Sequence, residues 1–172
     1  MPTEEERRPE QVVRRGVPAD AEAVATLLRR VREQNTGSIP PDVHSFAAML
    51  TWVRDTVLLH CDVWVADTGG EIVGVLVLRR PDWLEHLYLD AAATGAGLGS
   101  RLVDLAKAEL GGQVQLWTFT SNIGAQRFYE RHGFVAVERT DGDNDEGQPD
   151  IRYVYTPPEP RAAADGQSRM AP

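Results

Sequence analysis

Three features are scarce in this chain of 172 residues: it has one cysteine, no long apolar run and no excess of basic side chains. Cys61 has no partner for an intramolecular disulfide, which is typical of proteins from reducing compartments. Apolar runs such as residues 72–78 are far shorter than the roughly 20 residues that span a bilayer. The first six residues are mostly polar and do not form a secretory signal. We therefore expect a cytoplasmic protein with no membrane partner.

The charge balance and the absence of ligand patterns argue against two further classes. Acidic side chains outnumber basic ones by 26 to 18, which gives a net charge of −8. This balance argues against a partner with a phosphate backbone, so no nucleic acid is expected, and it is compatible with a cationic substrate. No group of His, Cys, Asp and Glu has the spacing of metal ligands, so we predict no metal site.

Hydrophobic periodicity predicts a single domain over residues 11–156, flanked by polar ends at 1–10 and 157–172 that we expect to be disordered. Segments with apolar residues at helical spacing are interspersed with runs that have the composition and period of strands. The expected strands are 11–15, 62–67, 71–80, 83–89, 113–119, 134–139 and 151–155, and the expected helices begin near residues 18, 43, 98 and 122. The predicted order is β-α-α-β-β-β-α-β-α-β-β.

A glycine-rich stretch at residues 94–99, Thr-Gly-Ala-Gly-Leu-Gly, follows a predicted strand and begins a helix. Its spacing matches neither the dinucleotide fingerprint nor a P-loop with its Lys-Ser/Thr pair. Glycines allow left-handed dihedrals that turn successive N–H groups toward an anion, and the helix dipole favours negative charge at this end. The loop therefore suits a phosphate, although a bare structural turn explains the glycines alone about equally well.

A second motif, residues 121–129, follows the next predicted strand. Asn122 and Tyr129 are seven residues apart, with Ala125 or Gln126 between them, so all three positions share one face of a helix. Outside such a pattern, a tyrosine is more often a partly buried aromatic whose hydroxyl is satisfied by a neighbour. Phe128 points in another direction, and we expect it to belong to the core.

Together, the two segments and the order of elements resemble the GNAT superfamily of acyl-CoA-dependent N-acetyltransferases over roughly residues 11–156. Residues 87–90 leading into the 94–99 loop are similar to the family's pyrophosphate loop. Its second motif is matched by Asn122, Ala125, Phe128-Tyr129 and Gly133-Phe134. Thr94 departs from the family, which usually has Arg or Gln there, and Ala91 replaces a frequent proline. Because the phosphate cradle is mostly main chain, we expect binding to survive this departure.

The resemblance implies an α/β (α+β) fold: a mixed, mainly antiparallel sheet of about seven strands with about four helices, in which the fourth and fifth strands splay apart. It also implies acetyl-CoA as cosubstrate, with the pantetheine arm on the free edge of the fourth strand and the diphosphate on loop N–H groups. Asn122 would bind the arm or the acyl end, and Tyr129 would protonate the departing thiolate. The implied cofactor-binding residues are Leu87, Tyr88, Leu89, Thr94, Gly95, Ala96, Gly97, Leu98, Gly99, Ser100, Asn122 and Tyr129.

Acyl transfer to an amine also needs a base, because an ammonium group has no lone pair with which to attack the thioester carbonyl. Glu85 is the first candidate, since strand alternation puts it on the side of Leu87 and Leu89. A solvated carboxylate at a strand end is an equally good interpretation. His86 points the other way and ranks lower, and Cys61, which has no neighbouring base, is expected to be buried and inert.

The resemblance places the acceptor amine near residues 39–44, Trp52, Trp83 and the loop at 141–150. That loop carries five carboxylates and no cation, which favours solvent exposure, mobility and a cationic acceptor. The predicted function is therefore acetyl transfer from acetyl-CoA to a small-molecule or peptide amine by direct attack in a ternary complex. A catalytically silent acyl-CoA sensor or scaffold, and a module that assembles through an edge strand, remain alternatives. Either a monomer or a homodimer is compatible with the sequence.

Overall fold

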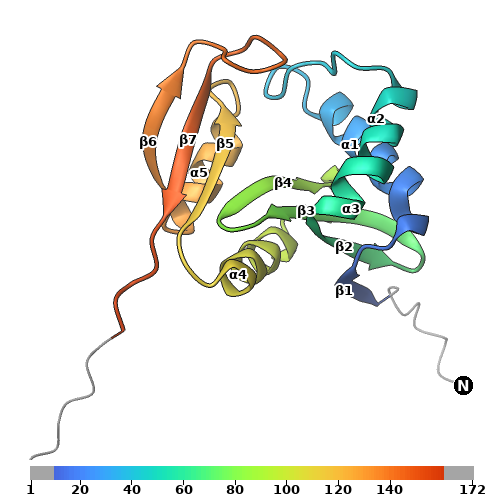
Figure 1. The fold of residues 1–172 in the computed structure, drawn as a ribbon, viewed down its shortest axis with the longest axis horizontal. Helices are drawn as coiled ribbons and strands as arrows, with labels where there is room; N and C mark the ends of the chain where they lie inside the picture. The colour runs from blue at the N-terminus through green and yellow to red at the C-terminus, as the bar shows by residue number, and fades with distance from the viewer. Residues whose placement is uncertain (1–9, 161–172) are drawn as a thin grey trace, which may run out of the picture.

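The computed structural model describes residues 10–160, which contain one seven-stranded sheet (Figure 1). The strands lie in the order β1-β2-β3-β4-β5-β7-β6, and every neighbouring pair is antiparallel except β4 and β5. Their bounds are β1 Gln11–Arg15, β2 Asp62–Thr68, β3 Glu71–Arg79, β4 Trp83–Leu89, β5 Val114–Phe119, β6 Val135–Thr140 and β7 Asp150–Tyr155. The predicted mixed sheet and the predicted order of elements are confirmed.

Four helical stretches accompany the sheet in the described residues. Three are the helices α1 Ala21–Gln34, α4 Leu98–Leu110 and α5 Ile123–Arg131, and the short 3-10 turns η1 Pro18–Asp20 and η3 Ala91–Ala93 precede α1 and α4. The fourth is continuous and consists of α2 Phe46–Trp52, the π-helical turn η2 Val53–Val57 and α3 Leu58–His60. It begins three residues after the predicted start at residue 43, because the Ser45 hydroxyl accepts the Ala48 N–H and caps it there.

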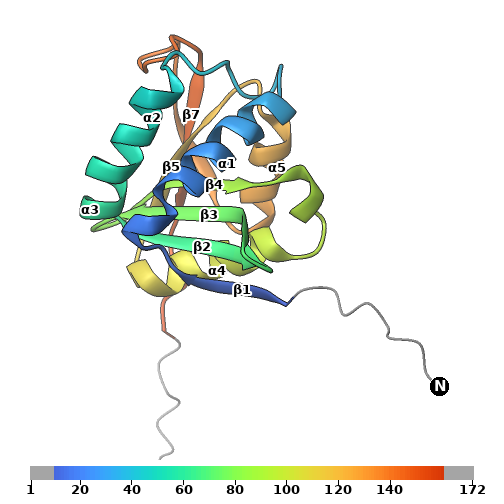
Figure 2. The ribbon, with the colours of Figure 1, turned by 90° about the vertical axis from the view of Figure 1, so that its right-hand side faces the viewer.

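Two hydrophobic cores lie on opposite faces of the sheet. In Figure 2, α1 and α2 cover one face of strands β1 to β4, and α4 lies on the other. Strand β3 contributes to both cores because successive side chains alternate: Val75 and Val77 pack toward α1, whereas Leu76 and Leu78 pack toward α4. The second core continues through Leu116 and Ile151 into β5 and β7. The α4 and α5 side of the molecule is therefore one packed layer.

Strands β4 and β5 pair at a single position and then separate. The one parallel pair is Trp83 with Gln115, at the first residue of β4. Beyond it, β4 keeps its antiparallel partner β3 on one side, and its other edge is open toward β5. The implied splay of the fourth and fifth strands is confirmed, and it leaves main-chain groups of β4 free for a ligand.

A β-bulge in β4 overturns one expectation from the sequence. Val77 is paired with His86 and Leu78 with Leu84, so Glu85 is the extra residue on β4. As a result Leu84, rather than Glu85, joins the core on the α4 side, while the Glu85 carboxylate accepts a 2.5 Å hydrogen bond from Arg79. The expectation that alternation puts Glu85 beside the leucines at 87 and 89 is therefore wrong, because the bulge interrupts the two-residue period.

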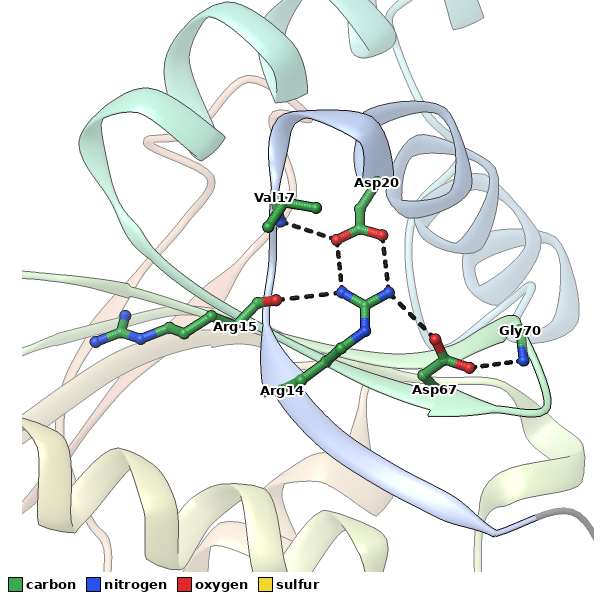
Figure 3. A network of polar contacts seen from close by, with 6 residues as sticks. All are labelled: Arg14, Arg15, Val17, Asp20, Asp67 and Gly70. Carbon is green, nitrogen blue, oxygen red and sulfur yellow. Dashed lines mark hydrogen bonds and ion pairs between the residues drawn. The ribbon is translucent and has the colours of Figure 1, made fainter.

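A polar network anchors the first strand far from this open edge (Figure 3). The Arg14 guanidinium donates two hydrogen bonds to Asp20, at 2.9 and 3.0 Å, and one to Asp67 at 3.1 Å. Asp20 also accepts the Val17 N–H, and Asp67 accepts the Gly70 N–H. The hydrogen bond from Arg14 holds the pKa of Asp20 below its usual range. The network connects β1, the start of α1 and the β2–β3 turn, which indicates a structural role.

The predicted disordered ends fall mainly on residues 1–9 and 161–172, which lie outside the described residues. The extent of a single domain over 11–156 stays a prediction. Among residues 10–160, no helix is both long and apolar enough to cross a bilayer.

Candidate active site

A cleft of about 360 Å³ occupies the space between the separated strands. Its walls come from residues 84–89 of β4, residues 116–119 of β5 and the first two turns of α5. The end of α1 and the loop after β4 close it on the remaining sides, through Val31, Asn35, Ala91 and Thr94. The two motifs predicted from the sequence therefore border one cleft.

The glycine-rich loop offers unhindered main-chain N–H groups where α4 begins. Gly95 and Gly97 have φ values of +80° and +83°, which residues with a side chain rarely adopt, and a Cβ atom on either would find open space. Gly99 differs because a Cβ there would lie 3.2 Å from the Phe128 side chain and 3.3 Å from that of Leu89, so both side chains would have to shift slightly. Two glycines give the loop its left-handed dihedrals at the N-terminus of α4, a position that favours an anion, and the third permits close packing.

The hydroxyl groups of the loop are already engaged within the protein. Thr94 Oγ1 donates to the Ala91 carbonyl at 2.7 Å. Ser100 Oγ lies 3.0 Å from Nε2 of His132, whose Nδ1 lies 2.7 Å from the Phe128 carbonyl. Because a carbonyl only accepts, Nδ1 carries a proton, and in the neutral imidazole the Ser100 hydroxyl donates to Nε2. The loop thus presents its main chain rather than its hydroxyls, and Leu98, which is buried in the core, contributes at most an N–H.

Asn122 and Tyr129 come from the same helix but are held differently. Asn122 Oδ1 caps α5 by accepting the Ala125 N–H at 3.1 Å, so its Nδ2 is the group left for a ligand. Tyr129 is 7% exposed and lines the cleft, and its hydroxyl forms no hydrogen bond within residues 10–160. Burial raises the pKa of Tyr129 well above its ordinary value, so the phenol keeps its proton at neutral pH.

The β4 side chains point to both faces while their main chain borders the cleft. Leu87 and Leu89 pack against the core on the α4 side. Tyr88 packs against the core on the α1 side, and His86 lies between the Tyr88 and Trp52 rings, with centroids 5.8 and 5.4 Å away. Packing around His86 lowers its pKa to about 4, so its imidazole is uncharged at pH 7. The predicted opposite orientation of His86 is confirmed.

A second cavity, of about 660 Å³, lies on the α1 and α2 side of β4 and shares His86 and Tyr88 with the cleft. Of the positions expected to surround an acceptor, the structure brings together Asp42, His44, Trp52 and residues 144–146 around it. Trp83 does not line it and instead lies under Arg79 at the far end of β4.

The acidic loop at 141–149 is held more firmly than its composition suggests. Arg32 in α1 donates a 2.9 Å hydrogen bond to Glu146, and both side chains are only 15% exposed. Asn144 donates to Asp150 at 2.9 Å, and Thr140 also donates to Asp150. Most of the loop is exposed as expected, including Asp145, whereas Asn144 and Glu146 are partly buried and bonded to the rest of the protein. Sequence reasoning missed Arg32 because nothing in α1 indicates that its partner lies 114 residues away.

Metal and thiol chemistry find no support among the described side chains. Within residues 10–160, no group of three or more His, Cys, Asp or Glu side chains is arranged to hold a metal ion. Cys61 is half-buried rather than fully buried, and burial raises the pKa of its thiol. A thiol with a raised pKa forms little thiolate and is a poor nucleophile.

Comparisons with known proteins agree with this geometry. A family model described as an acetyltransferase (GNAT) domain matches residues 60–136, which include β2 to β5, α4, α5 and both predicted motifs. A blasticidin-S acetyltransferase from Streptomyces morookaense is 41% identical over 75 residues, which are 38% of this chain and 52% of that protein. The chain thus spans about half the length of this curated relative.

Solved structures share the fold over most of the chain. A GCN5-related N-acetyltransferase from Rhodopseudomonas palustris has a TM-score of 0.70 at 20% identity and covers 87% of this chain and 97% of its own. The PaiA N-acetyltransferase from Thermoplasma acidophilum, in complex with coenzyme A, has a TM-score of 0.63 at 18% identity, with coverage of 86% and 99%. Residues 60–136 therefore match a GNAT acetyltransferase domain, and the described residues share the fold of these solved structures.

Proposed function

We propose that the protein is an acyl-CoA-dependent N-acyltransferase that moves an acetyl group from acetyl-CoA to a primary amine by direct attack in a ternary complex. The open edge of β4 opposite β5 carries this proposal, because it borders a cleft that also contains the Tyr129 phenol. The S. morookaense relative is an acetyltransferase, and the T. acidophilum protein holds coenzyme A. Both support the same chemistry here.

The cleft suits the parts of such a cosubstrate. A diphosphate would bind the N–H groups around Gly95 and Gly97, where the dipole of α4 favours negative charge. The amide groups of the pantetheine arm would pair with the open main chain of Leu87 and Leu89, as an added strand does. Asn122 Nδ2 would provide a further donor from the opposite wall.

Tyr129 would act as the acid. When bound, the cosubstrate supplies an activated acyl group as a thioester. As the amine nitrogen bonds to the thioester carbon and the C–S bond breaks, the sulfur takes the proton that the Tyr129 phenol holds. The phenol is protonated at pH 7, and its hydroxyl has no competing hydrogen-bond partner within residues 10–160. The product is an amide and a free thiol.

The amine must also lose a proton, and two neighbouring β4 residues are candidates for accepting it. Glu85 lines the cleft and is engaged by Arg79, whereas the uncharged imidazole of His86 lines both the cleft and the second cavity. The variants Glu85→Gln and His86→Gln identify the base. Substitution of the residue that acts as the base should lower kcat by about 100-fold or more, whereas substitution of the other residue should leave kcat nearly unchanged. If both variants keep the wild-type kcat, a chain of water molecules accepts the proton instead.

The decisive experiment measures thiol release from acetyl-CoA with a panel of primary amines, together with calorimetry of acetyl-CoA binding. Tyr129→Phe should lower kcat by about 100-fold or more while acetyl-CoA affinity changes little. Tyr155→Phe, which removes a hydroxyl outside both cavities, is the matched control. A folded protein that binds acetyl-CoA but acylates no amine would instead be a silent sensor, and one that binds no acetyl-CoA would refute the proposal.

A further inference from the structure

The second cavity has a chemical character of its own, distinct from that of the cleft. It lies between α1, the α2 stretch, β4 and the β6–β7 loop, and its volume of about 660 Å³ suits a small ligand. It meets the cleft at His86 and Tyr88. A molecule in this cavity can therefore place one end at the proposed acyl group while its body stays on the α1 side of the sheet.

Three aromatic rings line one side of the cavity in sequence. His86 lies between Trp52 and Tyr88, at centroid distances of 5.4 and 5.8 Å, and the Trp52 ring is edge-on to the imidazole. Because His86 is uncharged at neutral pH, this wall does not repel a cation. Aromatic rings pack favourably against the ring of a ligand, and their faces attract an ammonium group.

The cavity also carries acidic side chains. Asp42, Asp145 and Glu146 line the cavity together with a single arginine, Arg32. That arginine is already bonded to Glu146 and to the Pro40 carbonyl. The cavity therefore has a net charge of −2 when its histidines are counted as neutral. Within residues 10–160, Asp42 Oδ2 is also buried with no hydrogen-bond partner, a cost that a ligand donor reaching Asp42 would remove.

We propose that the acceptor is a compact aromatic diamine: one amine reacts, and a second, positively charged group is held by Asp42 and Asp145. This inference rests on the proposed function and names the substrate class for it. The reacting amine would sit at the junction beside His86, its ring against Trp52, and the second ammonium group among the carboxylates. The positive charge of that second group would offset part of the net charge of −2 that Arg32 leaves uncompensated.

Three probes of similar size separate the two features: para-xylylenediamine has a ring and two amines, benzylamine has the ring and one amine, and hexamethylenediamine has two amines and no ring. We expect kcat/KM of thiol release to be about ten-fold or more higher for para-xylylenediamine than for either other probe. Asp42→Asn should lower the value for both diamines by about ten-fold and spare benzylamine. Trp52→Leu should lower the values for the two ring compounds and spare hexamethylenediamine.

Controls make each outcome decisive. Circular dichroism and acetyl-CoA affinity verify that the variants fold, and Asp145→Asn, at an exposed position, replaces Asp42→Asn if the latter does not. Two results would overturn the proposal. One is a kcat/KM for hexamethylenediamine equal to that for para-xylylenediamine, and the other is an equal loss of kcat/KM for all three probes in Asp42→Asn. If no probe is acylated, calorimetry with coenzyme A present decides: selective binding of para-xylylenediamine would support the cavity's specificity while the acyltransferase function fails, and no selectivity would overturn both.

Discussion

The titration of His86 should contribute measurably to the pH dependence of stability. The pKa of His86 is lowered from 6.5 to about 4 in the folded protein, because the surrounding packing disfavours the charged imidazole. Below pH 6.5 the unfolded chain therefore binds a proton that the folded chain does not, and the free energy of unfolding decreases as pH falls. Above pH 6.5 both states are neutral, and this contribution is fully present.

The magnitude follows from the size of the shift. At about 1.4 kcal/mol per pKa unit, the free energy of unfolding should fall by about 3 kcal/mol between pH 7.5 and pH 4 because of this one group. The slope should be steepest between about pH 6 and 4.5, where only the unfolded state takes up the proton. Other groups, such as Asp20, also lose stabilising interactions in acid. They do so equally in wild type and in a His86 variant, so only the difference between the two proteins reports His86.

Urea denaturation followed by circular dichroism at several pH values measures this difference. His86→Phe keeps an aromatic ring beside Trp52 and Tyr88 but cannot titrate, so its stability should fall less steeply between pH 6.5 and 4. His86→Gln serves if the phenylalanine variant does not fold. His60→Gln, at the exposed end of α3, is the control and should follow the wild type. Parallel stability curves for wild type and both His86 variants would refute the reasoning.

Three further predictions concern the loop, the acidic segment and the β1 network. Gly97→Ala, at a φ of +83°, should cost about 1 kcal/mol of stability and weaken acetyl-CoA binding several-fold, whereas Gly111→Ala, with a φ of +70° at the other end of α4, should cost similar stability and spare binding. Arg32→Gln should speed hydrogen exchange in residues 141–149 and raise KM for the acceptor, and unchanged exchange would show that the ion pair to Glu146 does not hold the loop. Asp20→Asn should lower the free energy of unfolding at pH 7 by about 1 to 2 kcal/mol, measured by urea denaturation, and no loss would mean that the contacts in Figure 3 contribute little.

The fold could be predicted because local patterns and long-range packing agree along most of the chain. β3 has a run of aliphatic residues that is buried on both faces, and α4 has apolar residues at helical spacing that cover one of them. The two motifs could also be placed together, since each follows a neighbouring strand. Asn122 differs from the expectation in one respect. Its side-chain oxygen already accepts the Ala125 N–H and caps α5, so only Nδ2 is left for a ligand.

The parts that could not be predicted depend on contacts between distant segments. Alternation failed at Glu85 because a bulge inserts one residue, and the sequence of β4 does not mark that position. The ion pair of the acidic loop was not predicted because its partner, Arg32, is in α1. The cavity also joins distant segments: the family resemblance, rather than a local pattern, indicated residues 39–44, Trp52 and the loop at 141–150, and it did not indicate His86. Such features follow from tertiary packing, so local periodicity does not indicate them.

Side chains connect β4 to β5 at one end only, which keeps the sheet continuous there and leaves the cleft open beyond it. The Gln115 N–H donates to the Asp82 carbonyl, and its amide Nε2 donates to the Asp82 carboxylate, both at 2.8 Å. Gln115 Oε1 in turn accepts from Arg152 on β7, and Arg152 donates to Glu138 on β6. These bonds connect the two parts of the sheet only at the closed end of the cleft. The free main-chain groups of β4 beyond Trp83 therefore have no competing strand, and a ligand that supplies backbone-like amides can satisfy them.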